Sequence, residues 1–203
     1  MRIGVFGGAF DPVHWAHLGV AERCRDRAHL DEVWFLPSAH HPFKPDRQVS
    51  PFEHRVAMLR LAISDRPGIS VCEIERDLPS PTYTANVLDA LAERQPTNEW
   101  FFILGGDAVV ELPLWHDPPR ILARATLIAT ARPGHAVPST EQLRKNLALS
   151  AETPVRLQVV DLPPSDLSSR DIRRRVREGL SISGMVPPEV EKYILENGLY
   201  RSS

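Results

Sequence analysis

The chain has 203 residues, of which 42% are hydrophobic, so it is long enough to bury a full core as one compact domain. Its 24 basic and 26 acidic residues give a net charge of −2, and nothing marks it as a nucleic-acid-binding protein, whose surface is usually basic. The apolar run before Gly7 has four residues, far fewer than a signal peptide core or a membrane span of about 20 residues needs. The two cysteines, Cys24 and Cys72, show no CxxC spacing. We therefore expect a cytoplasmic protein with reduced core thiols and no membrane or nucleic-acid partner, and the sequence leaves open whether it forms a homo-oligomer.

Short apolar runs alternate with helical patterns along the chain. This alternation predicts an α/β fold with a doubly wound parallel sheet, covered by helices on both faces. Ligands of such sheets bind beyond the carboxyl ends of the strands, and a small helical portion is expected from about residue 168. We expect strands at Ile3–Phe6, Val33–Leu36, Ile69–Cys72, Trp100–Leu104, Thr126–Ala129 and Leu157–Val160, and helices at Trp15–Arg27, Pro51–Ser64, Thr84–Arg94 and Thr140–Leu149.

The most informative segment, GGAFDPVHWAH, follows the first expected strand. Glycine at positions 7 and 8 permits a sharp turn whose backbone N–H groups can approach a ligand closely. Asp11 and Pro12 predict an N-cap and the first residue of a helix, which should begin between about Pro12 and Trp15. The unpaired N–H groups and the dipole of that helix end favour a bound phosphate.

Two histidines, His14 and His17, stand three residues apart and so share a face of this helix or of its first turn. Both imidazoles can then donate hydrogen bonds to one anion. A glycine turn after a strand also occurs for packing alone, and a histidine pair at this spacing is also a metal half-site. A zinc site needs a further carboxylate or cysteine ligand, and none stands nearby. The other clustered histidines, His40 and His41, lie in a proline-rich loop that the helix-borne pair need not meet. A histidine-based metallohydrolase that uses all four histidines is the alternative of a different class.

A second glycine turn, Gly105-Gly106-Asp107, follows the strand at Trp100. The carboxylate of Asp107 can accept hydrogen bonds from ribose hydroxyls. The alternative is that Asp107 is simply a helix N-cap.

A cluster of serines and arginines stands near the C-terminus, where Ser168 and Asp171 form a capping-box pattern at an expected helix start. The ordinary explanation of such a cluster is a solvated charged face. The alternative is a second anion site, formed by serine hydroxyls, a helix N-terminus and arginine. The arginines that would share one helix face are Arg170, Arg173, Arg174 and Arg177.

Together these motifs resemble those of the nucleotidyltransferases related to class I aminoacyl-tRNA synthetases. The first run resembles their GxFDPxHxGH signature, the second turn their GxD element, and the C-terminal cluster their SSTxIR motif. The resemblance implies a Rossmann-like, HIGH-type nucleotidyltransferase fold. Two positions depart from the pattern: Ala16 stands for the usual glycine, and Arg170 for the usual threonine. Alanine adds one methyl group and keeps the helix, so we expect the site to survive.

The resemblance implies adenylyl transfer, in which a phosphate of one substrate attacks the α-phosphorus of ATP and pyrophosphate leaves. His14, His17 and Arg173 are the expected catalytic residues. Mg²⁺ is expected as cofactor, held mainly by nucleotide phosphates and water, with no protein metal ligand. The expected ATP-binding residues are Gly7, Gly8, Ala9, Phe10, His17, Gly105, Asp107, Ser168, Ser169 and Arg173.

Four further segments resemble the bacterial nicotinate-mononucleotide adenylyltransferases: HPFKP at 41–45, PTYT at 81–84, LPLWH at 112–116 and ARPG at 131–134. The resemblance covers nearly the whole chain and implies that ATP and nicotinate mononucleotide give deamido-NAD and pyrophosphate in NAD biosynthesis. An amide would present donors where acceptors are wanted, so we expect the acid form to be preferred. The expected nicotinate mononucleotide-binding residues are Lys44, Thr82, Tyr83, Thr84, Trp115 and Arg132.

The choice of acceptor depends on Trp115, which is either a stacking surface for a pyridinium ring or an ordinary buried anchor. Other acceptors therefore stay open, namely nicotinamide mononucleotide, phosphopantetheine and FMN. A non-catalytic nucleotide sensor would bind ATP without releasing pyrophosphate.

Overall fold

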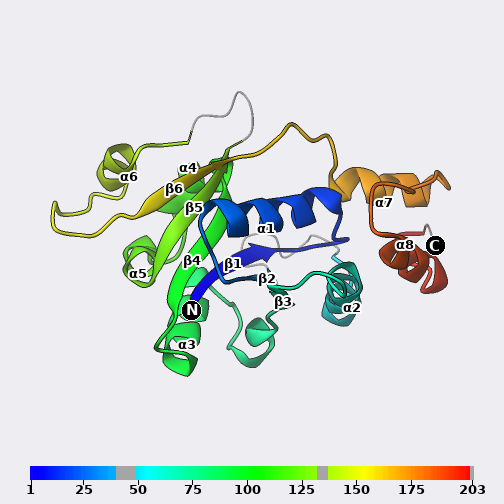
Figure 1. Cartoon of the computed structure of the whole chain (residues 1–203), viewed down its shortest axis with the longest axis horizontal. Coiled ribbons are helices and arrows are strands. Elements are labelled where there is room, and N and C mark those ends of the chain that lie inside the picture. The colour runs from blue at the N-terminus through cyan, green and yellow to red at the C-terminus, as the bar shows by residue number, and fades with distance from the viewer. Residues whose placement is uncertain (40–48, 132–136, 202–203) are drawn as a thin grey trace.

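The computed structural model describes residues 1–39, 49–131 and 137–201. Within these ranges six strands, all paired in parallel, form one sheet in the order β3-β2-β1-β4-β5-β6, and helices cover both of its faces (Figure 1). The strands are β1 (Arg2–Gly8), β2 (Glu32–Pro37), β3 (Ile69–Val71), β4 (Glu99–Gly105), β5 (Ala125–Ala131) and β6 (Leu157–Asp161). The helices are α1 (Trp15–Arg27), α2 (Phe52–Ala62), α3 (Thr84–Arg94), α4 (Gly106–Glu111), α5 (Pro118–Arg124), α6 (Thr140–Asn146), α7 (Ser169–Arg177) and α8 (Pro188–Glu196), with 3-10 turns η1 (Ile74–Asp77) and η2 (Leu112–Leu114).

The sheet separates two hydrophobic cores, and β4 contributes to both. Phe101 and Ile103 belong to the core under α1 and α2, whereas Trp100, Phe102 and Leu104 belong to the core under α3 and α5. Successive side chains of a strand point to opposite faces, so a strand buried on both sides is apolar throughout. This is why the continuous apolar run at 100–104 forms a central strand.

The strand order places a topological switch point between β1 and β4. The chain runs outward from β1 to β3, returns to β4, and runs outward again to β6. In doubly wound sheets the crevice for ligands lies at this point, outside the carboxyl ends of the strands. Both glycine turns leave the sheet there, one after Gly8 and the other at Gly105.

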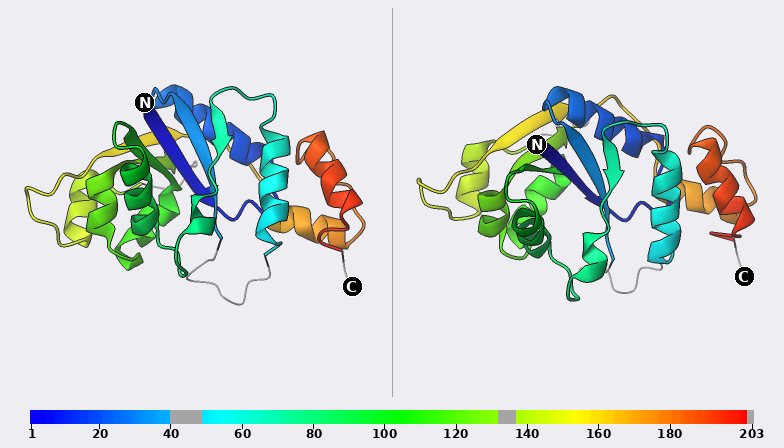
Figure 2. Two further views of the ribbon diagram at one scale, coloured as in Figure 1. Left: turned by 90° about the horizontal axis from the view of Figure 1, so that it is seen from below. Right: turned by 60° about the horizontal axis from the view of Figure 1, so that its bottom comes forward.

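The last two helices pack on the α1 side of the sheet. Ile172 of α7 and Val190 and Ile194 of α8 share the core that contains residues of α1 and α2. Figures 1 and 2 both show α7 and α8 beside α2, at the end of the molecule away from α6. The chain thus brings its C-terminal motif back to the segment that follows β1.

The doubly wound parallel sheet and all ten expected elements are confirmed, with shifts of a few residues at their ends. The N-cap assignment was wrong, because α1 begins at Trp15 with His14 in the N-cap position, and Asp11 and Pro12 lie in the preceding turn. No helix in the described ranges is long and apolar enough to cross a membrane. Both cysteines are free thiols, Cys24 being buried and Cys72 half-buried.

Candidate active site

The turn after β1 is shaped by Phe10, whose side chain is 2% exposed. A Cβ at Gly8 would meet the Phe10 ring at 2.9 Å, so only glycine leaves room for this ring. Phe10 has a φ of 50°, in the left-handed region that a bulky residue adopts only where its surroundings impose it. Edge-on packing against Phe6, Phe35 and His17, with centroids 5.0 to 5.4 Å away, supplies that constraint. The turn is therefore fixed in shape before any ligand binds.

The two motif histidines lie together at the start of α1. Their rings stack with centroids 3.7 Å apart, and His14 is buried. His17 Nδ1 accepts a hydrogen bond from the His14 backbone N–H at 3.3 Å. A neutral imidazole that accepts at Nδ1 carries its proton on Nε2, so His17 is a donor through Nε2. The arrangement suits an anion over the first turn of α1.

The second glycine turn joins β4 to α4. Gly105 occupies the N-cap position and Asp107 is the second residue of the helix, which argues against the N-cap alternative for Asp107. The carboxylate is exposed and folds back over the turn, because a Cβ at Gly105 would lie 2.5 Å from Asp107 Oδ1. The adjacent strands β1 and β4 thus present a backbone turn and a carboxylate at the same edge of the sheet.

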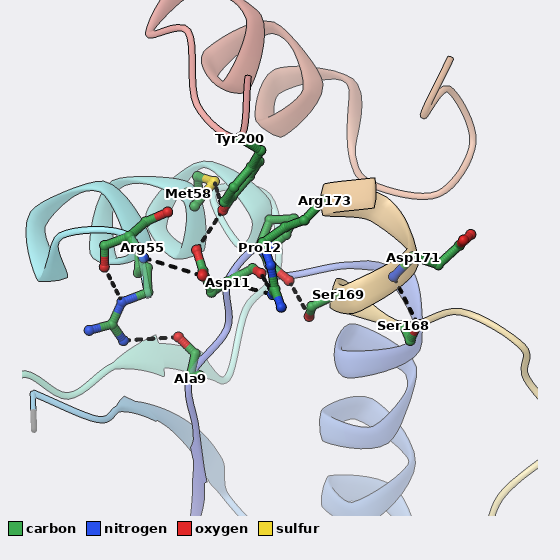
Figure 3. A network of polar contacts seen from close by, with 11 residues as sticks. Ala9, Asp11, Pro12, Arg55, Met58, Ser168, Ser169, Asp171, Arg173 and Tyr200 are labelled. Carbon is green, nitrogen blue, oxygen red and sulfur yellow. Dashed lines mark hydrogen bonds and ion pairs between the residues drawn. The ribbon is translucent and has the colours of Figure 1, made fainter. Parts of the chain in front are cut away.

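The C-terminal motif contacts the first motif directly (Figure 3). The Ser169 hydroxyl donates to the Pro12 carbonyl at 2.9 Å, and Arg173 Nη1 donates to the Asp11 carbonyl at 2.5 Å. Ser168 caps α7 as predicted, since its hydroxyl accepts from the Asp171 N–H at 3.2 Å. The two segments predicted to bind anions therefore contact each other, although they are more than 150 residues apart in sequence.

The arginines expected on one face of α7 differ in exposure and in their partners. Arg174 is exposed and forms ion pairs with Asp171 and Glu178, as a solvated face would. Arg173 instead turns toward the first motif, with only 16% of its side chain exposed.

The carboxylate of Asp11, a residue that the sequence pattern placed in a cap, is buried in a polar network (Figure 3). The Tyr200 hydroxyl donates to Asp11 Oδ1 at 2.7 Å and the Ser50 N–H donates to Oδ2 at 3.2 Å. Arg173 Nη1 lies 3.8 Å from Oδ2. Burial, and then the charge of Asp11, raise the pKa of Tyr200, so the phenol remains a proton donor. No local pattern in the sequence indicates Tyr200.

Arg55 of α2 is a second residue that the sequence pattern missed. It is 3% exposed and donates to three backbone carbonyls. Its Nη1 bonds to Ala9 O at 2.9 Å, Nη2 to Ser38 O at 2.8 Å and Nε to Ser50 O at 2.9 Å. Burial lowers the pKa of Arg55, while the charge of Asp11 opposes that shift. One guanidinium thus joins the glycine turn, the end of β2 and the start of α2.

Two of the four segments expected to hold the acceptor, 81–84 and 112–116, meet at an aromatic stack. The rings of Tyr83, in the N-cap position of α3, and His116 have centroids 4.2 Å apart and planes 25° from parallel. Thr82, which precedes Tyr83 in the chain, is buried, and Thr84 begins α3. Trp115 is half-buried, with its ring edge-on to Phe102. It therefore serves in part as a buried anchor, which was the alternative to a stacking surface for the pyridinium ring.

Some expected residues lie outside the described ranges, namely His40, His41, Lys44 and Arg132. In the part of the chain that the structure describes, no three or more His, Cys, Asp or Glu side chains come together as a metal-binding group.

The chain is similar to known proteins in both sequence and fold. Residues 5–175 match the cytidylyltransferase-like family. The chain is 42% identical over 200 residues to a probable nicotinate-nucleotide adenylyltransferase of Roseiflexus castenholzii, and 36% identical over 201 residues to one of Bacillus pumilus, with 98% and 99% of both chains covered. Its fold is similar to that of a Plasmodium falciparum nicotinic acid mononucleotide adenylyltransferase complexed with NaAD, with a TM-score of 0.77 at 20% identity, covering 98% of this chain and 97% of that one. The chain therefore belongs to the nicotinate-nucleotide adenylyltransferases, within the cytidylyltransferase-like family.

Proposed function

We propose that the protein transfers the adenylyl group of ATP to nicotinate mononucleotide, giving deamido-NAD and pyrophosphate in NAD biosynthesis. The observation that carries the proposal is the junction of the two phosphate motifs, where Ser169 and Arg173 bond to the backbone between the glycine turn and the histidine pair. Relatives across the whole chain bear the name of this activity.

The reaction needs alignment more than proton transfer. The attacking phosphate of nicotinate mononucleotide is already anionic at neutral pH, so no general base is required. The protein must hold the two substrates in line and neutralise the charge that develops on the α-phosphate and the leaving pyrophosphate. We assign His14 and His17 to the α- and β-phosphates, because they lie at the N-terminus of α1 and His17 Nε2 is a donor. Ser168, Ser169 and Arg173 are assigned to the departing pyrophosphate.

The adenosine half is assigned to the carboxyl edge of β1 and β4. The backbone from Gly7 to Phe10 lines the turn over which the nucleotide lies. Asp107 is exposed beside Gly105 and accepts from the ribose hydroxyls in this proposal. The crevice between these strands is where doubly wound sheets bind nucleotides.

The acceptor is assigned to the start of α3 and the segment 112–116. The first N–H groups of a helix have no partner within it, so those after Tyr83 can donate to the nicotinate carboxylate. The Tyr83–His116 stack and the Trp115 ring form the aromatic boundary of this region. The amide of nicotinamide mononucleotide would place donors against these donors, so the acid is preferred. Lys44 and Arg132 remain predicted contacts.

Mg²⁺ bound to the nucleotide would stabilise the charge on the phosphate oxygens. The donor set of the site fits an ion held by phosphates and water, since it consists of N–H, hydroxyl and guanidinium groups. The buried carboxylate of the turn, Asp11, already accepts hydrogen bonds from Tyr200 and Ser50, with Arg173 Nη1 3.8 Å from Oδ2.

The test is pyrophosphate release from ATP and Mg²⁺ with four acceptors offered separately: nicotinate mononucleotide, nicotinamide mononucleotide, FMN and phosphopantetheine. We expect release mainly with nicotinate mononucleotide and formation of deamido-NAD. Release with another acceptor would overturn the acceptor assignment and keep the phosphate assignment. If none of the four acceptors gave pyrophosphate release, the proposed reaction would be overturned. Stoichiometric zinc in the purified protein would then favour a metallohydrolase.

A further inference from the structure

Arg173 is anchored on one side only. Its Nη1 donates to the Asp11 carbonyl and lies 3.8 Å from Asp11 Oδ2. Its Nε and Nη2 groups make no hydrogen bond or ion pair with any residue of the described ranges. A guanidinium has five N–H donors in a fixed fork, so this one has donors left for a second anion.

Arg173 lies farther from the Asp11 carboxylate than a close ion pair would place it, at 3.8 Å from Oδ2. A buried carboxylate attracts the nearest cation unless other donors satisfy its oxygens, and a charge-assisted N–H···O bond is about 2.8 Å long. Here the Tyr200 hydroxyl satisfies Oδ1 and the Ser50 N–H satisfies Oδ2, while the nearest guanidinium nitrogen stays at 3.8 Å. Because these two neutral donors satisfy the carboxylate, it does not form a close ion pair with Arg173.

Tyr200 is suited to hold this carboxylate. It lies among buried groups, with its hydroxyl 4.0 Å from Met58 Sδ and 2.7 Å from Asp11 Oδ1 (Figure 3). Its φ of 64° is in the left-handed region, which a tyrosine adopts only where its surroundings fix it. Burial and the charge of Asp11 raise its pKa, so the phenol keeps its proton and donates it to Asp11 Oδ1.

We propose that Tyr200 is a positioning residue for the nucleotide phosphates: its hydroxyl saturates Asp11, so that Asp11 fixes Arg173 in place without neutralising it. The inference rests on the proposed function, since it assumes that Arg173 binds the outer phosphates. Without the phenol oxygen, Oδ1 of Asp11 recruits the Arg173 guanidinium, which then forms a close ion pair and turns its donors away from the nucleotide.

The test is a double-mutant cycle read out as the Kd of ATP with Mg²⁺, measured by titration calorimetry. Tyr200→Phe keeps the ring and should weaken ATP binding about tenfold, the scale of one charge-assisted hydrogen bond. In the Arg173→Ala background the same substitution should have no further effect. The matched control is Tyr193→Phe, which removes a hydroxyl 2.9 Å from His54 Nδ1, in the same C-terminal part but away from Asp11. We expect it to leave the Kd of ATP unchanged.

Two results would overturn the inference. One is a Kd of ATP for Tyr200→Phe equal to that of the wild type. The other is an equal loss in both backgrounds, which is what a purely structural role of Tyr200 predicts. Because the readout is binding, it is independent of turnover: a wild type that binds ATP but makes no deamido-NAD contradicts the proposed function and leaves the cycle decisive. A wild type that does not bind ATP overturns both.

Discussion

The ring of His14 stacks on the ring of His17, with centroids 3.7 Å apart and planes 22° from parallel. The backbone N–H of His14 fixes Nδ1 of His17, and the other nitrogen of that ring becomes a donor. One histidine thus sets the orientation and the tautomer of the other. In the proposed reaction this pre-arranges a hydrogen bond to a phosphate before ATP arrives.

The first prediction concerns this donor. His17→Ala should lower kcat by a factor of about 100 to 1000, as loss of one pre-organised donor does elsewhere. The fold should be little affected, because His17 is only half-buried and alanine favours helices. The measurements are steady-state kinetics and thermal unfolding. The control is His29→Asn at an exposed position with a φ of 51°, which asparagine tolerates. Near-normal turnover in His17→Ala would contradict the assigned role.

A second prediction uses the close approach of Gly105 to Asp107. An alanine Cβ at 105 would lie 2.5 Å from Asp107 Oδ1 and push the carboxylate aside, while the φ of −68° there suits any residue. Gly105→Ala should raise KM for ATP about tenfold, as loss of a ribose hydrogen bond would. Asp107→Ala should have a similar effect, and the double variant should be no worse than either.

The matched control for that experiment is Gly19→Ala in α1, where a Cβ meets no atom within 4 Å. This substitution should leave KM for ATP unchanged and stabilise the protein by up to about 1 kcal/mol through helix propensity. A KM for ATP that Gly105→Ala leaves unchanged would count against the ribose assignment.

A third prediction concerns stability. Arg55→Met removes three hydrogen bonds from a buried guanidinium and leaves the carbonyls of Ala9, Ser38 and Ser50 without that donor. We expect a loss of about 4 kcal/mol in the free energy of unfolding, measured in urea. The control is Arg60→Met on the same helix, an exposed arginine paired with Glu73, which should change stability by about 0.5 kcal/mol or less. Equal losses from the two variants would refute the structural role of Arg55.

The fourth prediction is a pH dependence of stability that arises from Glu75. Burial raises the pKa of this carboxyl from 4.5 to about 7, against the opposing hydrogen bond from the Ala39 N–H and the charge of Arg55. Between about pH 4.5 and 7 the folded state holds the proton more tightly than the unfolded state, so folding stability falls as the pH rises through this window. The fall attributable to Glu75 is about 3 kcal/mol, and it is complete above pH 7.

Substitution isolates this effect, because glutamine does not titrate. Relative to the wild type, Glu75→Gln should become progressively more stable between pH 5 and pH 8, as measured by urea unfolding at each pH. A constant difference between Glu75→Gln and the wild type across this range would show that Glu75 has no raised pKa.

Local patterns predicted the parts of the fold that local forces determine. The apolar run at 100–104 became a central strand, and α3 begins and ends at the expected residues, Thr84 and Arg94. The short helices α4 and α5 were not predicted, because six or seven residues contain too few turns to show a periodicity. Patterns along the sequence therefore located the strands of the sheet well.

Local sequence patterns could not predict the buried hydrogen bonds that hold the site together. Asp11-Pro12 has the form of a helix start, but the carboxylate of Asp11 has partners that are distant in sequence, such as Ser50 and Tyr200. Nothing in the sequence around Arg55 distinguishes it from an exposed helix residue. Its burial is explained by its hydrogen bonds to three backbone carbonyls. Contacts of this kind are made by tertiary packing, which no window along the chain contains.

The hydrogen bond between Asp11 and Tyr200 spans 189 positions of the chain. A ribosome makes chains from the N-terminus at about 5–20 residues per second, so a nascent chain holds its glycine turn many seconds before it holds the tyrosine that anchors it. During that interval the sheet can assemble while Asp11 of the turn lacks its hydrogen bond from Tyr200. If Tyr200 positions Arg173 as proposed, the growing polypeptide reaches its full affinity for ATP only once residue 200 has emerged, so the core folds before the site is complete.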